Sequence, residues 1–430
     1  MNLFLRSSAF LTALVFCIPL FAAPSAEVSA GIAVVDLTPP PGGRTVGYAP
    51  PPTTDGVNHP ITARVLVLQS SHASVAIVVW DLCVATSPWL HAHIAELGID
   101  HLLLLNTHTH SGPDLDQPGF PAADAPLRTT VERKVFAAIQ EAKKNSFPAF
   151  FAAGEGSIQL GYNRLVRQPG GFSITHFDNL ERIPYGPVDP TVSVLRVTDA
   201  QNNVRAVLVN YACHSVVLGP TNKKLSADYP GALRKEVETK LGGNAVCFFL
   251  QGAAGDINPL MMGRSGEDAK DLPVVEEMGK ALATEVLSVL DQIKSTQGKS
   301  EQLSLASKTL SVENRWHADQ SLRTGVATVL LNSDIGIVAM PGEPFHQFQV
   351  DWRRKSGLVH PFFLGYCTNA DYPWTGYMPD IESAARGGYG ASDATQLAVG
   401  GGERLLNEGL AQLFTLQGRL RNSPQRHLNQ

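Results

Sequence analysis

The feature that most constrains how this chain can fold is a pattern that occurs four times: an apolar, strand-like run ends and polar residues follow at once. The four segments read LLLLNTHTH, AVLVNYACH, CFFLQGAAGDIN and GIVAMPGE. Short apolar runs bounded by turn-forming residues are typical of buried strands. In sheet-based folds, ligands bind where the ends of strands converge. We therefore expect these four segments to meet at one site.

The rest of the chain indicates both helices and strands. Strand-like runs alternate with stretches of helical periodicity, and several strand-like runs are adjacent in sequence. The expected helices lie over residues 90–98, 127–144, 229–242, 271–293 and 404–416. This combination predicts an α/β (α+β) fold in which helices flank mixed β-sheets, instead of a regular array of βαβ units.

The composition is that of a globular protein. The 430 residues are 44% hydrophobic and 17% charged, which provides enough apolar material for a large core. The net charge of −5 is mild and gives no reason to expect nucleic acid or an anionic membrane surface as a partner. The composition does not determine the oligomeric state.

The N-terminus has the features of a secretory signal peptide. Arg6 supplies a positive charge, residues 9–23 are apolar, and small residues follow. A single transmembrane anchor is the alternative, but the apolar stretch is short and contains Pro19. We therefore expect a secreted or periplasmic protein without a stable membrane anchor. The expected organisation is a signal peptide, one domain and a polar tail, over residues 1–26, 27–418 and 419–430.

Four cysteines follow the predicted signal peptide, and their spacings match no metal or redox motif. Three of the four lie in apolar, strand-like runs, so free buried thiols are expected although two disulfides would be allowed outside the cytoplasm. The residues are Cys83, Cys213, Cys247 and Cys367.

Two histidines at the end of the first apolar run are the first candidates for chemistry. His108 and His110 are two residues apart, and on a strand such residues point to the same side. Together with His214 and Glu343, which follow two of the other runs, they would suit Zn²⁺ with one position open to water. The spacing alone is weak support, because a histidine in a strand often only forms hydrogen bonds in or near the core.

Acidic residues and a glycine-rich turn leave two other interpretations to consider. Asp81, Asp228 and Asp256 are candidates for a two-metal phosphatase site. Asp228 and Asp256, which are expected at exposed turns, could instead be partners of the zinc ligands. The segment QGAAGDINP lacks the lysine and hydroxyl residue of a phosphate-binding loop, so nucleotide binding is not expected.

Several motifs in this sequence resemble the catalytic N-terminal domain of the neutral/alkaline ceramidase family. They keep the family's order and cover nearly all of the chain after the signal peptide. The motifs are VVDLTPP, THTHSGP, NYACHSVVLGP, LSADYPG, LQGAAGDINP, MPGEPF and GYMP followed by GGYGAS. The resemblance implies a ceramidase-like zinc hydrolase domain over residues 27–418.

The resemblance also implies a metal site with one Zn²⁺ per chain. In the family, the first histidine of the HTH pair, a later histidine at a strand end, the Glu of PGE and a tyrosine bind zinc. Carried over, the ligands are His108, His214, Glu343 and Tyr377. Tyr372 is the alternative to Tyr377, because the spacing before GYMP differs from the family's.

The same resemblance assigns catalytic roles to His110, Arg164 and Asn258. His110 would transfer a proton, and Arg164 would contact the substrate carbonyl or the intermediate. Asn258 stands where the family carries a serine. Because an amide is no nucleophile but can donate a hydrogen bond to an oxyanion, zinc-activated water is favoured over a serine acyl-enzyme.

The expected reaction is hydrolysis of an amide bond, N-acyl and ceramide-like, or of an ester bond. Two alternatives stay open at this point. The first is an esterase or lactonase that acts on a small, non-lipid substrate. The second is a catalytically silent relative that binds metal, for which the change to Asn258 is the main argument.

Overall fold

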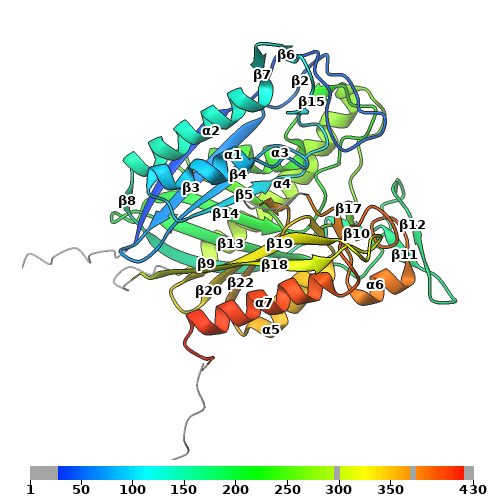
Figure 1. Cartoon of the computed structure of the whole chain (residues 1–430). Coiled ribbons are helices and arrows are strands. Elements are labelled where there is room, and N and C mark those ends of the chain that lie inside the picture. Colours follow the sequence, from blue (N-terminus) through cyan, green and yellow to red (C-terminus); the bar gives the residue numbers. More distant parts are fainter. Residues whose placement is uncertain (1–27, 295–300, 369–373, 421–430) are drawn as a thin grey trace, which may run out of the picture.

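Three β-sheets meet around one central apolar core, and helices cover the outer face of each sheet (Figure 1). The structure is a computed structural model that describes residues 28–294, 301–368 and 374–420. Each sheet places one face in the central core, which is why so many strands of this sequence are apolar throughout. The three outer faces form separate apolar layers with the helices.

The first sheet has six strands, in the order β23-β5-β4-β3-β1-β8. Its strands are β1 (Ser29–Asp36), β3 (Thr62–Gln69), β4 (Ser74–Trp80), β5 (His101–Asn106), β8 (Phe147–Pro148) and β23 (Cys367–Thr368). Strands β3 and β4 pair antiparallel, whereas β4 and β5 run parallel. The outer face is covered by α1 (Pro88–His93), the short 3₁₀ helix η1 (Ile94–Leu97) and α2 (Leu127–Lys144).

The second sheet has four strands, in the order β16-β14-β13-β9. They are β9 (Phe150–Ser157), β13 (Thr191–Thr198), β14 (Val204–Tyr211) and β16 (Val246–Gln251). Strands β14 and β16 are parallel, so their carboxyl ends lie side by side. Helices α3 (Asp228–Lys240) and α4 (Asp268–Gln292) pack on the outer face.

The third sheet has the order β18-β19-β20-β22. Its strands are β18 (Leu303–Glu313), β19 (Ser321–Leu331), β20 (Ile335–Ala339) and β22 (His360–Leu364). Strands β20 and β22 are parallel. Helices α5 (His346–Ser356) and α7 (Gly401–Leu416) cover this sheet at the bottom of Figure 1.

Short elements complete the fold, and two pairs of them lie near the predicted site residues. Strand β10 pairs with β17, and β21 pairs with β24. The short elements are β2 (Gly56–Val57), β6 (Pro121–Ala122), β7 (Ala125–Pro126), β10 (Gly161–Asn163), β11 (Leu165–Arg167), β12 (Ser173–Thr175), β15 (Lys224–Leu225), β17 (Ile257–Pro259), β21 (Glu343–Pro344), β24 (Tyr377–Met378) and α6 (Ile381–Arg386).

The period of two along a strand distributes the apolar residues between the two layers. In β4, Ile77 and Val79 lie in the central core, whereas Val78 and Trp80 lie in the layer under α1 and α2. Because both faces are buried, the strand has to be apolar at every position. Burial of a side chain of this size contributes about 1.5–3 kcal/mol.

Most of the elements expected from the sequence are present, and the α/β fold class is confirmed. All five expected helices form, the first one as α1 followed by η1. The β18–β19 hairpin, β22 and α5 were not predicted.

The four cysteines named above are buried and free, as expected. Within the described ranges, no helix is long and apolar enough to cross a membrane. The predicted signal peptide lies outside the described residues, and the predicted domain boundaries stay predictions.

Candidate metal centre and active site

Three predicted metal ligands from three different sheets meet at one point. His108 follows β5, His214 follows β14, and Glu343 opens β21 just after β20. One Glu343 carboxylate oxygen (Oε2) lies 3.3 Å from Nε2 of His108 and 3.3 Å from Nε2 of His214. All three side chains are buried, and the ligand atoms lie within 4.8 Å of one another. The prediction that these strand ends converge is confirmed.

Hydrogen bonds to backbone carbonyls orient both imidazole rings. Nδ1 of His108 donates to the carbonyl oxygen of Cys83 at 2.9 Å, and Nδ1 of His214 donates to that of Ala254 at 2.6 Å. A carbonyl oxygen only accepts, so Nδ1 carries the proton in the neutral form of each ring. The Nε2 atoms that face Glu343 therefore present lone pairs.

This arrangement of acceptors fits a divalent cation. With both rings neutral, two imidazole lone pairs and a carboxylate oxygen would repel one another at 3.3 Å, and a cation between them would remove this repulsion. Without a cation, burial lowers the pKa of His108, but Cys83 and Glu343 outweigh it and raise this pKa well above its usual range. Nε2 of His214 and Oε2 of Glu343 are buried and have no hydrogen-bond partner in the described part of the chain. Two histidines and one carboxylate, each held by the surrounding backbone, are a common ligand set for catalytic zinc.

The chain reaches this geometry by a turn and not by strand alternation. Strand β5 ends at Asn106, and His108 has a φ of 62°. This left-handed conformation is unusual for a residue other than glycine, and it occurs where surrounding structure enforces it. The backbone N–H of His108 donates to the carbonyl of Leu82 at 2.9 Å, which helps to fix the turn. His108 and His110 do lie together, as expected. The expected cause was wrong, because the two residues follow a turn and are not on one face of a strand.

His110 lies beside the three clustered ligands without joining them. Its Nε2 is 3.2 Å from Nε2 of His108, but it is absent from the set formed by His108, His214 and Glu343. Its Nδ1 is buried without a hydrogen-bond partner among the described residues. Burial and the neighbouring imidazoles lower the pKa of His110 well below its usual range, so this ring is neutral and can accept a proton.

Arg164 and Asn258 hold each other at the edge of the same site. Nη1 of Arg164 donates to the Asn258 side-chain oxygen at 3.2 Å, and Nη2 donates to the carbonyl of Gly255 at 2.7 Å. The Asn258 amide group donates to the carbonyl of Phe177 at 3.1 Å. Strand β17 brings Asn258 here by pairing with β10, next to Arg164. Asn258 therefore orients the guanidinium, and its predicted bond to an oxyanion stays a prediction.

The structure places Tyr377 next to the candidate metal ligands and adds a second tyrosine. Tyr377 in β24 is paired with Glu343 in β21, and its ring centroid is 5.1 Å from Cζ of Arg164. Tyr366 was not predicted. Its ring lies 4.5 Å from that of His108, and its hydroxyl is buried without a hydrogen-bond partner in the described ranges. The alternative ligand Tyr372 lies outside the described residues.

The three aspartates considered for a second metal are all engaged elsewhere. Both oxygens of Asp81 accept hydrogen bonds of 2.8 Å from Arg234. Asp228 accepts from backbone N–H groups, including that of Leu218 at 2.9 Å. Asp256 pairs with Nδ1 of His346 at 2.6 Å. All three are buried, so the expectation that Asp228 and Asp256 lie at exposed turns was wrong. The site offers no second set of acidic ligands among these three aspartates.

Two cavities open on the candidate metal site. One has a volume of about 260 Å³ and is bordered by His214 and Arg164. The other, of about 490 Å³, is bordered by His108, Glu343 and the aromatic residue Trp316. Four residues border both cavities: Gly47, His110, Tyr377 and Tyr389. A substrate bound across this boundary would place one part on each side of His110.

Sequence reasoning missed several residues of this site. Tyr366 follows the apolar run of β22, so the pattern of polar residues after a strand applies to it as well. Tyr48 and Arg264 border the smaller cavity from loops far apart in sequence. No local pattern in the sequence distinguishes them, because only the tertiary fold brings them to the site.

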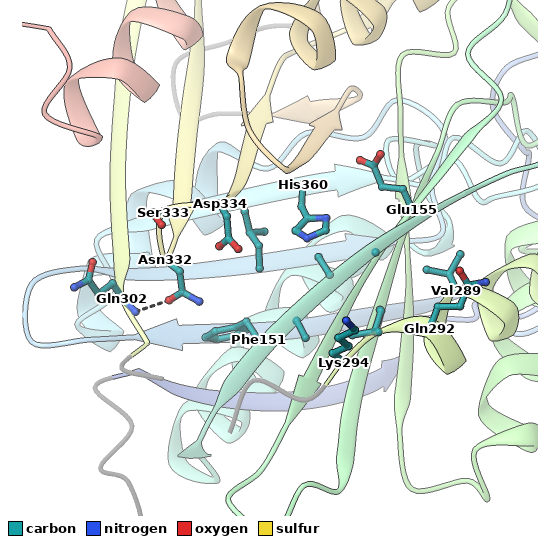
Figure 2. Close-up of a pocket in the computed structure, with 15 residues that line it drawn as sticks. Phe151, Glu155, Val289, Gln292, Lys294, Gln302, Asn332, Ser333, Asp334 and His360 are labelled. Carbon is teal, nitrogen blue, oxygen red and sulfur yellow. Dashed lines mark hydrogen bonds between the residues drawn. The ribbon is translucent and has the colours of Figure 1, made fainter. Parts of the chain in front are cut away.

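A further cavity of about 650 Å³ lies away from this site (Figure 2). It is bordered by β9 and by Asp334 and His360 near the starts of β20 and β22. Glu343 follows the opposite end of β20. The labelled Glu155 is held by Arg353, with one contact of 2.8 Å. We assign no function to this cavity.

The fold and the clustered side chains define the class of this protein: an α/β protein with helix-covered sheets and a candidate divalent-metal centre at the strand ends. Two solved structures share the fold. The chain matches neutral ceramidase from Pseudomonas aeruginosa with a TM-score of 0.73 and 16% identity, over 93% of this chain and 76% of the other. A structure described as ceramidase complexed with C2 matches with a TM-score of 0.72 and 15% identity, over the same shares.

The family is shown by sequence. The N-terminal region of neutral/alkaline non-lysosomal ceramidases matches residues 29–331, and the chain belongs to this family. Neutral ceramidase A of Dictyostelium discoideum is 26% identical over 56% of this chain and 37% of its own length. Neutral ceramidase B of the same organism is 27% identical over 52% and 34%. The match therefore spans little more than a third of each relative.

Proposed function

We propose that the chain is a zinc-dependent hydrolase that cleaves an amide bond, or an ester bond, with activated water. One observation carries this proposal: two imidazole lone pairs and a carboxylate oxygen face one another in a buried site, with contacts of 3.3 Å. His108, His214 and Glu343 would hold the metal, with a phenol from Tyr377 or Tyr366 close to them. When bound, zinc would supply a Lewis acid for the carbonyl and lower the pKa of a coordinated water.

His110 is the residue best placed to move protons in this reaction. Its ring is neutral because burial lowers its pKa, and its Nδ1 has no partner in the described part of the chain. A neutral imidazole can take the proton of the attacking water and later give it to the leaving nitrogen or oxygen. Such a general base contributes about 10²–10⁴ in rate.

Arg164 would stabilise the negative charge that develops on the carbonyl oxygen. Its guanidinium is buried, and its hydrogen bonds to Asn258 and Gly255 fix its position before the substrate arrives. A pre-oriented donor in a water-poor site is worth about 10²–10³ in turnover.

The substrate would lie across the boundary between the two cavities. The names of the relatives point to ceramide, a lipid-like amide, and the aromatic wall of the larger cavity would accommodate an acyl chain. An esterase or lactonase with a smaller substrate is the second candidate. It is favoured by the small volume of the cavity next to Arg164, about 260 Å³.

A silent metal-binding relative is less well supported than an enzyme. The change to Asn258 removes a hydroxyl, but His110 and Arg164 remain at the site, and Asn258 itself holds Arg164. A phosphatase is disfavoured because Asp81, Asp228 and Asp256 have other partners. Secretion or export to the periplasm belongs to this proposal, on the basis of residues 1–26.

The test is hydrolysis by the purified protein before and after chelation. The substrates are a short- and a long-chain N-acyl amide and the matching esters. The proposal predicts turnover that a chelator abolishes and that added Zn²⁺ restores. Turnover that survives complete removal of metal would refute the zinc mechanism. Absence of turnover in the zinc-loaded protein with every substrate would favour the silent relative.

A further inference from the structure

Arg264 is an arginine at the candidate active site to which the proposed mechanism gives no role. It lies between β17 and α4, and it borders the smaller cavity together with His110 and His214. Its side chain packs directly on the backbone of Gly219. A Cβ atom at that glycine would lie 2.5 Å from Nη1 of Arg264, so the absence of a side chain there gives the guanidinium its place.

The charge of Arg264 is offset in part by its electrostatic interaction with the buried carboxylate of Asp228, but two of its nitrogens lack a hydrogen-bond acceptor in the described part of the chain. Its Nε and Nη1 are buried and have no hydrogen-bond partner among the residues that the structure describes. The ion pair that it makes is with Asp178, whose oxygen is 3.4 Å from Nε. The Asp178 side chain is 68% exposed, whereas that of Arg264 is 17% exposed. Since water screens an exposed carboxylate, this pair offsets little of the cost of burying a guanidinium.

Two buried arginines outside the site form hydrogen bonds with carboxylates. Arg234 forms two hydrogen bonds of 2.8 Å with Asp81, and Arg64 binds the carboxylate of Glu238. At the smaller cavity, Arg164 bonds only to neutral oxygens of Asn258 and Gly255. Within the described ranges, neither of the two arginines that border this cavity has a carboxylate hydrogen bond, and in this they resemble Arg196 and Arg315, which donate to backbone carbonyls elsewhere in the fold.

The remaining wall of the smaller cavity does not neutralise these two positive charges. Asp178 is the acidic residue in its border. The hydroxyl of Tyr48 donates to the carbonyl of Leu218 at 2.9 Å, and burial raises the pKa of Tyr48 to about 12, so its phenol stays neutral. Without a ligand, the border of the cavity holds two guanidinium groups and one solvent-screened carboxylate. The buried carboxylates of Asp228 and Glu343, which do not border this cavity, offset part of the charge of Arg264 and Arg164 respectively.

We propose that Arg264 selects substrates that carry an oxyanion group, of which a carboxylate is the smallest. The inference rests on the proposed function and narrows its substrate to an amide or ester that ends in an oxyanion group, which ceramide does not carry. With the scissile carbonyl at His108 and His214, the part of the substrate in the smaller cavity would bring its carboxylate to Arg264. Because Nε and Nη1 of Arg264 are covered by protein, the contact to the carboxylate would come from Nη2. Charge-assisted hydrogen bonds of this kind are the strong ones.

The test uses two substrates that differ only at this group, N-hexanoylglycine and N-hexanoylethanolamine. Wild type is expected to prefer the glycine conjugate in kcat/KM by about 10- to 100-fold, the value of one charge-assisted contact. Arg264→Gln should remove this preference, and Arg264→Lys should keep part of it. Asp178→Asn, which removes the competing carboxylate, should increase it.

Arg182→Gln is the matched control, because its side chain is 49% exposed and pairs with Glu277 on the surface. Zinc content and thermal unfolding of each variant verify folding.

The possible results distinguish a failure of the anion selectivity of Arg264 from a failure of the proposed hydrolase function. Equal kcat/KM for both substrates in wild type, or a preference that survives in Arg264→Gln, would overturn the inference and leave the hydrolase standing. If neither substrate is hydrolysed, the inference is tested by measuring the affinity of the zinc-loaded protein for the same two compounds by calorimetry. Tighter binding of the glycine conjugate that Arg264→Gln abolishes would support the anion site, and equal binding would overturn it.

Discussion

At the residue scale, backbone carbonyls determine the chemistry of the site. The imidazoles of the two candidate ligands His108 and His214 each donate a hydrogen bond from Nδ1 to a backbone carbonyl, and in the neutral rings this leaves both Nε2 lone pairs facing Glu343. The sequence identified His108, His214 and Glu343, because each follows an apolar strand. It could not predict the left-handed turn at His108, since that conformation is enforced by contacts with a loop distant in sequence.

A buried pair behind the site gives a pH-dependent contribution to stability. Asp256 accepts hydrogen bonds from the backbone N–H and from Nδ1 of His346, at 2.8 Å and 2.6 Å. Burial alone would lower the pKa of His346, but Asp256 outweighs it and raises this pKa above its usual value of 6.5. Burial would raise the pKa of Asp256, yet its partners lower it.

The sign of the pH effect follows from these two directions. The raised pKa of His346 stabilises the fold fully below 6.5, and this contribution is lost as pH rises through the folded-state value. The lowered pKa of Asp256 stabilises the fold above 3.8 and is lost as pH falls through its folded-state value. We predict that His346→Leu costs about 3 kcal/mol near pH 6 and less at pH 9. Urea unfolding of both proteins at the two pH values measures this. A cost that does not depend on pH would contradict the assignment.

At the scale of elements, helix α4 approaches α3 closely because of a glycine. A Cβ atom at Gly279 would lie 2.4 Å from Cβ of Ala232 and 2.7 Å from the backbone nitrogen of Leu233. Helical periodicity predicted both helices, but it did not predict their separation. The sequence analysis also missed the β18–β19 hairpin. Strand β18 lacks the apolar run that marks the buried strands, since many of its residues are exposed or half-buried, whereas β19 is buried over its second half.

We predict that Gly279→Val destabilises the protein by at least about 2 kcal/mol, because the helices would have to move apart. Lys280→Ala on the exposed side of the same helix is the control, and it should change stability by less than about 0.5 kcal/mol. Chemical unfolding monitored by circular dichroism measures both. Equal stability of Gly279→Val and wild type would show that α3 and α4 tolerate a wider separation.

At the scale of the whole molecule, a buried asparagine joins two of the three sheets. The Asn210 amide in β14 donates to the carbonyls of Leu250 in β16 and Phe363 in β22, at 2.9 Å and 2.8 Å. Its side-chain oxygen accepts from the backbone N–H of Phe363 at 3.0 Å. This residue therefore links the sheet that ends at His214 to the sheet that ends near Glu343.

We predict that Asn210→Ala lowers the free energy of unfolding by about 2–4 kcal/mol, because it leaves buried backbone groups without partners. It should also weaken zinc binding, since two ligands come from the sheets that Asn210 connects. Thermal unfolding with and without zinc measures both effects. A destabilised variant with unchanged zinc affinity would show that the ligands are held locally and not through the sheets.

The sequence predicted those parts of the fold in which a local pattern of residues reflects burial. It predicted less where segments distant in sequence pack together. Strand ends, helices and the family motifs could be read directly, and they placed His108, His110, His214, Arg164 and Glu343 at one site. The division into three sheets around a common core, and the approach of Arg264 to the smaller cavity, depend on packing between distant segments. The sequence carries no local record of that packing.

The central claim is that His108 binds the metal, whereas His110 acts on the reacting bond. The most direct test is the zinc content of purified His108→Ala and His110→Ala, measured beside wild type and together with turnover. We predict about one zinc per chain in wild type and in His110→Ala, with turnover of the latter reduced by about 10²-fold or more. His108→Ala should lose zinc and turnover together. Equal loss of zinc in both variants, or full zinc in His108→Ala, would contradict the account.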